Sequence, residues 1–239
     1  MIINAEKNGF KELNNLIRNS SKSCEIVNCL GQRFIGTGMS DVSISIEGIP
    51  GNALGAYLTG AEITVKGNAQ DAVGDTMNDG KIIIHGNVGD AAGYAMRGGS
   101  IYIKGNAGYR AGIHMKAYKD KKPLIVIGGR AGSFLGEYQA GGLIIVLGLN
   151  SDNKPIVGNF PCTGMHGGKM VLRGKADNIE FPKSVTVKKA DENDLAEITP
   201  FIEKYCDYFG CDFKKIINEE FTVITPDTNN PYKQLYVAN

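Results

Sequence analysis

A 19-residue internal period constrains the fold of this chain more than any other feature. Glycine recurs at Gly48, Gly67, Gly86 and Gly105, each 19 residues after the one before. Every unit opens with glycines and closes with a short alternating run such as residues 100–104, and none contains a helix-length segment. A fixed period of this size is typical of a solenoid, in which each unit buries its apolar side chains against its neighbours.

The alternating runs define an interior. Aligned on these runs, the units give about seven coils across residues 29–173. The sixteenth and eighteenth places of the coils are apolar throughout: Ile44, Ile63, Ile82, Ile101, Ile125, Ile144 and Met170, then Ile46, Val65, Ile84, Ile103, Ile127, Val146 and Leu172. Two inward places separated by one outward place match the period of a strand. Strands stacked about 4.8 Å apart can pair in parallel, and such crossovers are nearly always right-handed. The sequence therefore predicts an all-β fold, a right-handed parallel β-helix of about seven coils with short N- and C-terminal helices.

Flanking segments are expected to cap this rod at both ends, because the terminal coils of a solenoid must be shielded. Residues 1–28 are predicted to form an N-terminal cap with a helix, residues 29–190 the β-helix, and residues 191–239 a C-terminal helical segment and tail. The N-terminal helix would present one apolar face, formed by Phe10, Leu13, Leu16 and Ile17.

The C-terminal segment is expected to hold more than one helix. Residues 191–209 are acidic at their start and amphipathic later. Within them, Thr199 and Pro200 resemble an N-cap followed by a first-turn proline, which predicts either two short helices or a kink. A further short helix is expected near residues 212–219, and the tail from residue 221 to residue 239 is expected to be irregular.

One outward face of the coils is apolar over most of its length. The seventeenth place is polar in the first two coils, as Ser45 and Thr64, and apolar in the next five, as Ile83, Tyr102, Val126, Ile145 and Val171. An uncovered stripe of that length is unusual on a monomer. We expect residues 191–209 to fold back over it, and the alternative is a partner protein docked on the same residues.

Composition excludes several classes of function. Lys and Arg number 26 against 25 Asp and Glu, so no net field attracts nucleic acid or an anionic membrane. The N-terminus lacks a signal-peptide pattern and no stretch approaches 18 apolar residues, so we expect a cytoplasmic protein. Five cysteines without a CxxC pair argue against a disulfide framework or a zinc site.

The motifs predict structure rather than chemistry. Glycine at the eighth place suits a corner that needs positive φ, and no phosphate-binding signature is present. The eleventh place, mostly methionine, is expected to fill the core. His85, His114 and His166 fall at different places of different coils, and the aspartates are dispersed in turns. We therefore predict no catalytic, cofactor-binding or metal-binding residue, and treat the lysines at 116, 119, 121 and 122 as a solvated loop.

Three glycine-rich units carry a resemblance to a known family. Residues 67–74, 86–99 and 129–136 resemble the GXGXG domain at the C-terminal end of the glutamate synthase large subunit. Residues 112–116 and 134–138 look like the free-standing form of that domain in archaeal-type, split glutamate synthases. One of the subunits of formylmethanofuran dehydrogenase is similar in the same repeats. The resemblance implies a right-handed parallel β-helix that acts as a scaffold beside catalytic subunits.

The same resemblance implies a function and partners. The chain would be a non-catalytic subunit of a glutamate synthase, beside a glutamine amidotransferase subunit and an FMN-binding synthase subunit. FMN and an iron–sulfur cluster would be held by the synthase subunit, with no cofactor on this chain. Self-association is left open. The alternatives are a subunit of formylmethanofuran dehydrogenase or a related complex, and, in another class, a β-helical acyl- or carbohydrate-active enzyme. A period of 19 disfavours the hexapeptide acyltransferase repeat, and the absence of Trp disfavours a carbohydrate groove.

Overall fold

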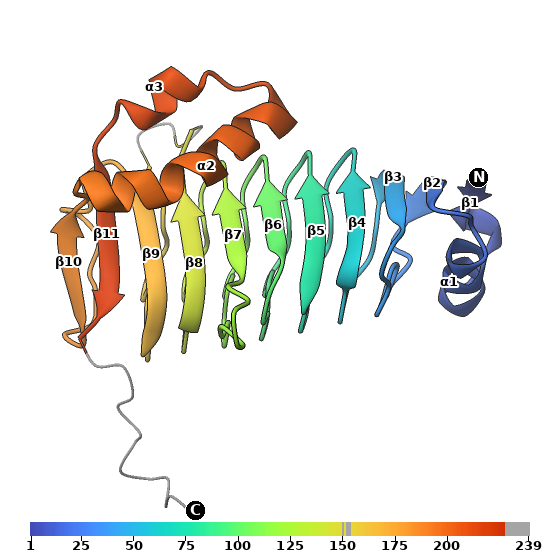
Figure 1. Ribbon diagram of the computed structural model, residues 1–239, viewed down its shortest axis with the longest axis horizontal. Coiled ribbons are helices and arrows are strands. Elements are labelled where there is room, and N and C mark those ends of the chain that lie inside the picture. Colours follow the sequence, from blue (N-terminus) through green and yellow to red (C-terminus); the bar gives the residue numbers. More distant parts are fainter. Residues whose placement is uncertain (150, 152–153, 228–239) are drawn as a thin grey trace, which may run out of the picture.

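The computed structural model describes residues 1–149, 151 and 154–227, and Figure 1 shows an elongated solenoid whose strands stand side by side along its length. Within the described residues, nine successive strands pair in parallel, each with the next. They are β1 (Ile2–Asn4), β2 (Ser23–Leu30), β3 (Ser43–Ile49), β4 (Thr59–Val65), β5 (Asp79–Ile84), β6 (Ser100–Ile103), β7 (Leu124–Ile127), β8 (Ala140–Val146) and β9 (Gly167–Arg173). The predicted parallel β-helix is confirmed.

The inward places lie where the period puts them. The pairing register joins Ile82 to Ile101 and Ile101 to Ile125, so the ladder continues across the longer fifth coil. All fourteen predicted inward side chains are at most 1 % exposed. Because each aliphatic ladder runs the length of the rod, every coil stabilises its neighbours by removing apolar surface from water.

Glycine at the eighth place of the first six coils suits both backbone and packing, and Cys162 stands at this place in the seventh coil with φ 60. Gly112 has φ +70, and a Cβ there would lie 2.5 Å from Cδ1 of Ile144 in β8, the strand of the next coil. The same conformation recurs at this place in the other coils. A side chain would therefore both strain the backbone and overpack the core.

Asparagine and aspartate side chains join successive turns. Asn68 accepts a hydrogen bond from the Asn87 N–H at 2.8 Å, and Asn87 accepts one from the Asn106 N–H at 2.7 Å. Asp71 and Asp90 make the same contact with the next coil. These polar residues satisfy backbone donors that the short strands leave unpaired, which gives the dispersed carboxylates a structural role.

The array extends further toward the N-terminus than the period indicates. Strands β1 and β2 precede the first predicted coil, and Ile26 of β2 is fully buried. A short 3-10 helix, η1 (Ala5–Lys7), and α1 (Phe10–Arg18) follow β1. Helix α1 lies at the N-terminal end of the rod in Figure 1. Asn14 fixes it there by donating to the Phe34 carbonyl and accepting from the Gly36 N–H.

The C-terminal end of the rod is closed by an antiparallel pair. Strand β11 (Phe221–Pro226) lies between β9 and β10 (Val185–Lys189), and it is antiparallel to both. The prediction that residues 221–226 are irregular is wrong, because their partners are strands distant in the chain that no local pattern identifies. Residues 228–239 of the predicted tail lie outside the described residues.

One long helix stands where Thr199 and Pro200 suggested either two short helices or a kink. Helix α2 (Glu192–Phe209) is continuous through Pro200 and is capped by Asp191, which accepts from the Asn193 and Asp194 N–H groups. The Thr199 hydroxyl donates to the Leu195 carbonyl inside the helix instead of capping a new one. Helix α3 (Phe213–Ile217) confirms the short helix expected near residues 212–219. In the described part of the chain, no helix combines the length and apolarity needed to cross a bilayer.

Candidate functional site

Helix α2 lies over the apolar outward stripe. Figure 1 shows α2 crossing the strands at the C-terminal half of the rod. Beneath it, the five stripe residues are between 0 % and 4 % exposed: Ile83, Tyr102, Val126, Ile145 and Val171. Side chains of the helix, among them Ile198, Ile202 and Tyr205, join them in a second apolar core. The structure therefore leaves these five residues too little surface for a partner protein to dock on, although Tyr102 still lines the groove described below.

Ion pairs and one tyrosine hold α2 in place. Lys169 of β9 contacts Asp194 and Glu197, each at 2.7 Å, and Lys188 of β10 contacts Asp194 at 2.7 Å. Burial tends to raise the pKa of Asp194, yet hydrogen bonds from the two lysines outweigh it and lower that pKa to about 2. Near the other end of the helix, the Tyr205 hydroxyl donates to the Lys104 carbonyl at 3.2 Å.

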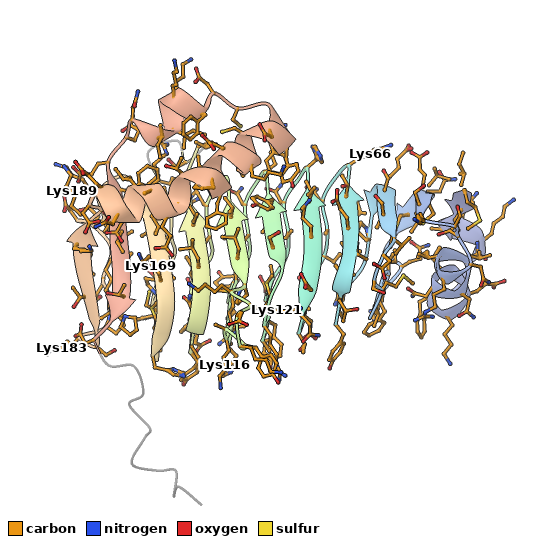
Figure 2. The ribbon with its side chains drawn as sticks, viewed as in Figure 1. Lys66, Lys116, Lys121, Lys169, Lys183 and Lys189 are labelled. Carbon is orange, nitrogen blue, oxygen red and sulfur yellow. The ribbon has the colours of Figure 1, made fainter. Side chains whose placement is uncertain are left out.

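A groove runs along the lower side of α2. It has a volume of about 650 Å³, and its opposite wall is formed by Ala117, Lys121 and Lys122 of the insertion loop. The floor is one row of strand residues that pair in register, namely Ser100, Leu124, Leu143 and Lys169. Adjacent strands lie about 4.8 Å apart, so these four positions span about 14 Å. Figure 2 shows Lys169 below the helix and Lys121 toward the lower ends of the strands.

The groove has an apolar floor and a charged rim. Tyr102, Leu124 and Leu143 reach it from below, and Phe201 of α2 closes one side. Lys121 is paired with Asp79 at 2.6 Å, and its hydrogen bond lowers the pKa of that carboxyl. Lys122 also lines the groove, and it has no ion-pair partner among the described residues.

A second surface feature follows the turns. We call it the aromatic edge, and it comprises Tyr94, Arg110, His114, Phe134, Tyr138 and Phe160. One row stacks His114 on Tyr138 with centroids 5.1 Å apart, and Tyr94 packs edge-on against His114 at 6.0 Å. In the other row, the Arg110 guanidinium lies 4.9 Å from the centroid of the Phe134 ring. The ring centroids of Phe134 and Phe160 are 5.3 Å apart.

Strained backbone positions carry most of the aromatic edge. His114, Tyr138, Phe134 and Phe160 have φ between 53 and 62. A non-glycine residue in this left-handed region costs roughly 1–2 kcal/mol. Gly38 and Gly164 stand at the place that His114 and Tyr138 occupy in their own coils, so the backbone itself does not need a side chain there.

The histidine, cysteine and acidic side chains are groups of this chain that could bind a metal or act as nucleophiles. Within residues 1–149, 151 and 154–227, no three His, Cys, Asp or Glu side chains gather as metal ligands. The three histidines make different contacts: His85 packs edge-on against Phe209, His114 belongs to the aromatic edge, and His166 contacts the Gly164 carbonyl. All five cysteines are free thiols. Burial raises the pKa of Cys162 to about 12, which makes it unreactive.

Sequence reasoning missed both surface features. The loop lysines are exposed, as expected, but the sequence did not indicate that Lys121 and Lys122 line a groove. The signal present in the sequence was the 24-residue spacing from Gly105 to Gly129, which marks an insertion on the same face as the amphipathic C-terminal segment. For the aromatic edge, the signal was aromatic residues mostly at the sixth and tenth places of the later coils, where several other coils carry glycine, alanine or threonine.

Comparisons with known proteins agree with this architecture. The family model described as GXGXG motif matches residues 3–229. An uncharacterized protein of Methanocaldococcus jannaschii is 44 % identical, over 100 % of this chain and 97 % of that protein. Among solved structures, a chain of the formyltransferase/hydrolase complex of Methylorubrum extorquens, determined with methylofuran, is similar in fold, with a TM-score of 0.62. That likeness has 22 % identity and covers 82 % of this chain and 70 % of the other. The repeats, the parallel solenoid and the family match together establish that this chain belongs to the GXGXG motif family.

Proposed function

We propose that this chain is the β-helix subunit of a cytoplasmic multi-subunit enzyme complex, and that the complex acts on one-carbon formyl groups rather than making glutamate. The fold neighbour belongs to a formyltransferase/hydrolase complex, which supports the formyl alternative over glutamate synthase. The family match is compatible with either complex. We further propose that the chain holds no redox cofactor and that its partner subunits carry the catalytic groups.

The aromatic edge is the observation that carries the subunit role. Tyr138 is 38 % exposed, Tyr94 40 % and Phe160 58 %. Tyrosine, arginine and phenylalanine are enriched at protein–protein contacts, where they contribute much of the binding energy. At the same places of other coils, Ala91 and Ala95 have the same positive φ, so the turn itself does not require an aromatic side chain there, which favours a use for these rings on the surface. A partner protein that covers both rows would supply that use.

Co-purification with mass spectrometry tests the proposal. The chain is tagged at its genomic locus and isolated at low salt, and the stoichiometric partners are identified. We expect subunits of a formyl-transferring or formyl-oxidising enzyme. Recovery of a glutamine amidotransferase with an FMN-binding synthase subunit would instead support the glutamate synthase alternative. A chain that elutes alone at its monomer mass would contradict the subunit role altogether.

A further inference from the structure

The groove between α2 and the insertion loop combines four features of a small-molecule site: its volume, its walls, its floor and its rim. Its volume of about 650 Å³ lies in the range of ligand pockets. Its walls come from elements that are separately fixed, since Lys121 ties the loop to Asp79 and Lys169 ties α2 to β9. Rigid walls reduce the entropy lost when a ligand binds.

The floor selects an apolar ligand body. Leu124 donates its backbone N–H to the Gly99 carbonyl at 3.0 Å, and Leu143 donates to the Pro123 carbonyl at 2.9 Å. These floor groups are therefore used in coil-to-coil pairing and offer a ligand few hydrogen bonds. Leu143, Tyr102 and Phe201 provide apolar contact over the same stretch. A polar chain lying here would lose its hydration without compensation, whereas an aromatic or aliphatic body would gain from burial.

The rim selects a negative charge. Three lysines line the groove, and two of them are neutralised by carboxylates, Lys121 by Asp79 and Lys169 by Asp194 and Glu197. Lys122 is exposed and is the lysine of the lining without an ion-pair partner in the described part of the chain. Its ammonium group is therefore free to bind an anionic group on the side of the groove that the insertion loop forms.

We propose that this groove is a binding site for a small amphipathic anion. The ligand has an aromatic or aliphatic body that lies over Leu124 and Leu143 and packs against Phe201. A carboxylate, sulfonate or phosphate group at one end of it contacts Lys122. The other charged side chains of the lining stay in the ion pairs that hold the walls.

The probe for the test is anilinonaphthalene sulfonate, an aromatic monoanion whose emission rises in apolar sites, and N-phenylnaphthylamine is its uncharged counterpart. Both are titrated into the full chain. We expect one saturable sulfonate site per chain, with the neutral dye binding more weakly. Lys122→Gln should weaken the sulfonate about tenfold, as loss of a charge-assisted hydrogen bond does, and leave the neutral dye unchanged. Ser100→Phe should abolish binding of both by filling the floor.

Two matched variants separate the site from general effects. Lys119→Gln removes the same charge from the same loop outside the groove, and Ser45→Phe adds the same ring to the outward face of β3. Both should bind the dyes as the unaltered chain does, and thermal melts should show that all variants are folded. The proposal is overturned if Lys122→Gln weakens the sulfonate no more than Lys119→Gln does. It is also overturned if folded Ser100→Phe still binds the sulfonate normally, or if the neutral dye binds as tightly as the anion.

Discussion

Replacing Asp194 by asparagine tests how α2 is anchored to the solenoid. Asp194 contacts Lys169 and Lys188 at 2.7 Å each, and its side chain is 7 % exposed. Against the ordinary aspartate value of 3.8, a folded-state pKa of about 2 corresponds to about 2 kcal/mol of stabilisation at neutral pH. We therefore expect Asp194→Asn to lower the free energy of unfolding by about 2 kcal/mol at pH 7, measured by urea titration.

The pH dependence of that difference has a definite sign. Because folding lowers the pKa of Asp194, its contribution is fully present above about pH 4 and is lost as pH falls toward the folded value of about 2. The difference between wild type and Asp194→Asn should shrink over that window. Glu197→Gln is the control: this residue pairs with the same Lys169, but its side chain is 45 % exposed, so we expect a loss of about 1 kcal/mol or less. An Asp194→Asn loss below about 0.5 kcal/mol at pH 7, or one that does not change with pH, would refute the anchoring role.

Three further predictions concern the core and the thiols. Ile103→Asp should unfold the array, since it places an unpaired charge in a fully buried ladder. A thermal melt close to that of wild type would show that Ile103 does not face inward. Gly112→Ala should lower the free energy of unfolding by about 2–4 kcal/mol in chemical denaturation, because it adds backbone strain and overpacking against Ile144. Gly38→Ala, with φ +66 and open space around it, should lower it by only about 1 kcal/mol. Equal losses for the two variants would exclude the packing argument. A thiol reagent should modify partly exposed Cys211 under native conditions and reach Cys162 only on unfolding, so early modification of Cys162 would contradict its burial.

The period predicts the part of the fold that repeats and little else. From Gly48 onward the strands recur mostly every 19 residues, so their inward places could be assigned without a structure. The first two strands do not follow from the period because their spacing is irregular: Ile26 pairs with Ile3 across α1 and with Ile46 next to a bulge. Strand β11 does not follow from it either, because antiparallel pairing with β9 leaves no periodic trace.

The candidate site was only partly accessible from sequence. The alternation at the seventeenth place identified the apolar stripe, because inward and outward positions follow directly from strand geometry. The groove depends on where three distant segments meet: the loop around Lys121, the α2 residues near Phe201, and the floor at Leu143. The loop is tied down by the ion pair between Lys121 and Asp79, which lie 42 residues apart in sequence, and no spacing rule predicts such a contact.

Native mass spectrometry of the purified assembly tests the central claim most directly, because it compares association of the unaltered chain with that of a variant on the aromatic edge. The double variant Tyr138→Ser with Phe160→Ser removes exposed aromatic surface from both rows of that edge. Tyr118→Ser removes a tyrosine of similar exposure, 53 %, from the insertion loop and serves as the control. The account predicts that the unaltered chain and Tyr118→Ser are found in the complex, and that the double variant is folded but found as a monomer. A double variant that assembles with its partners as completely as the unaltered chain would contradict it.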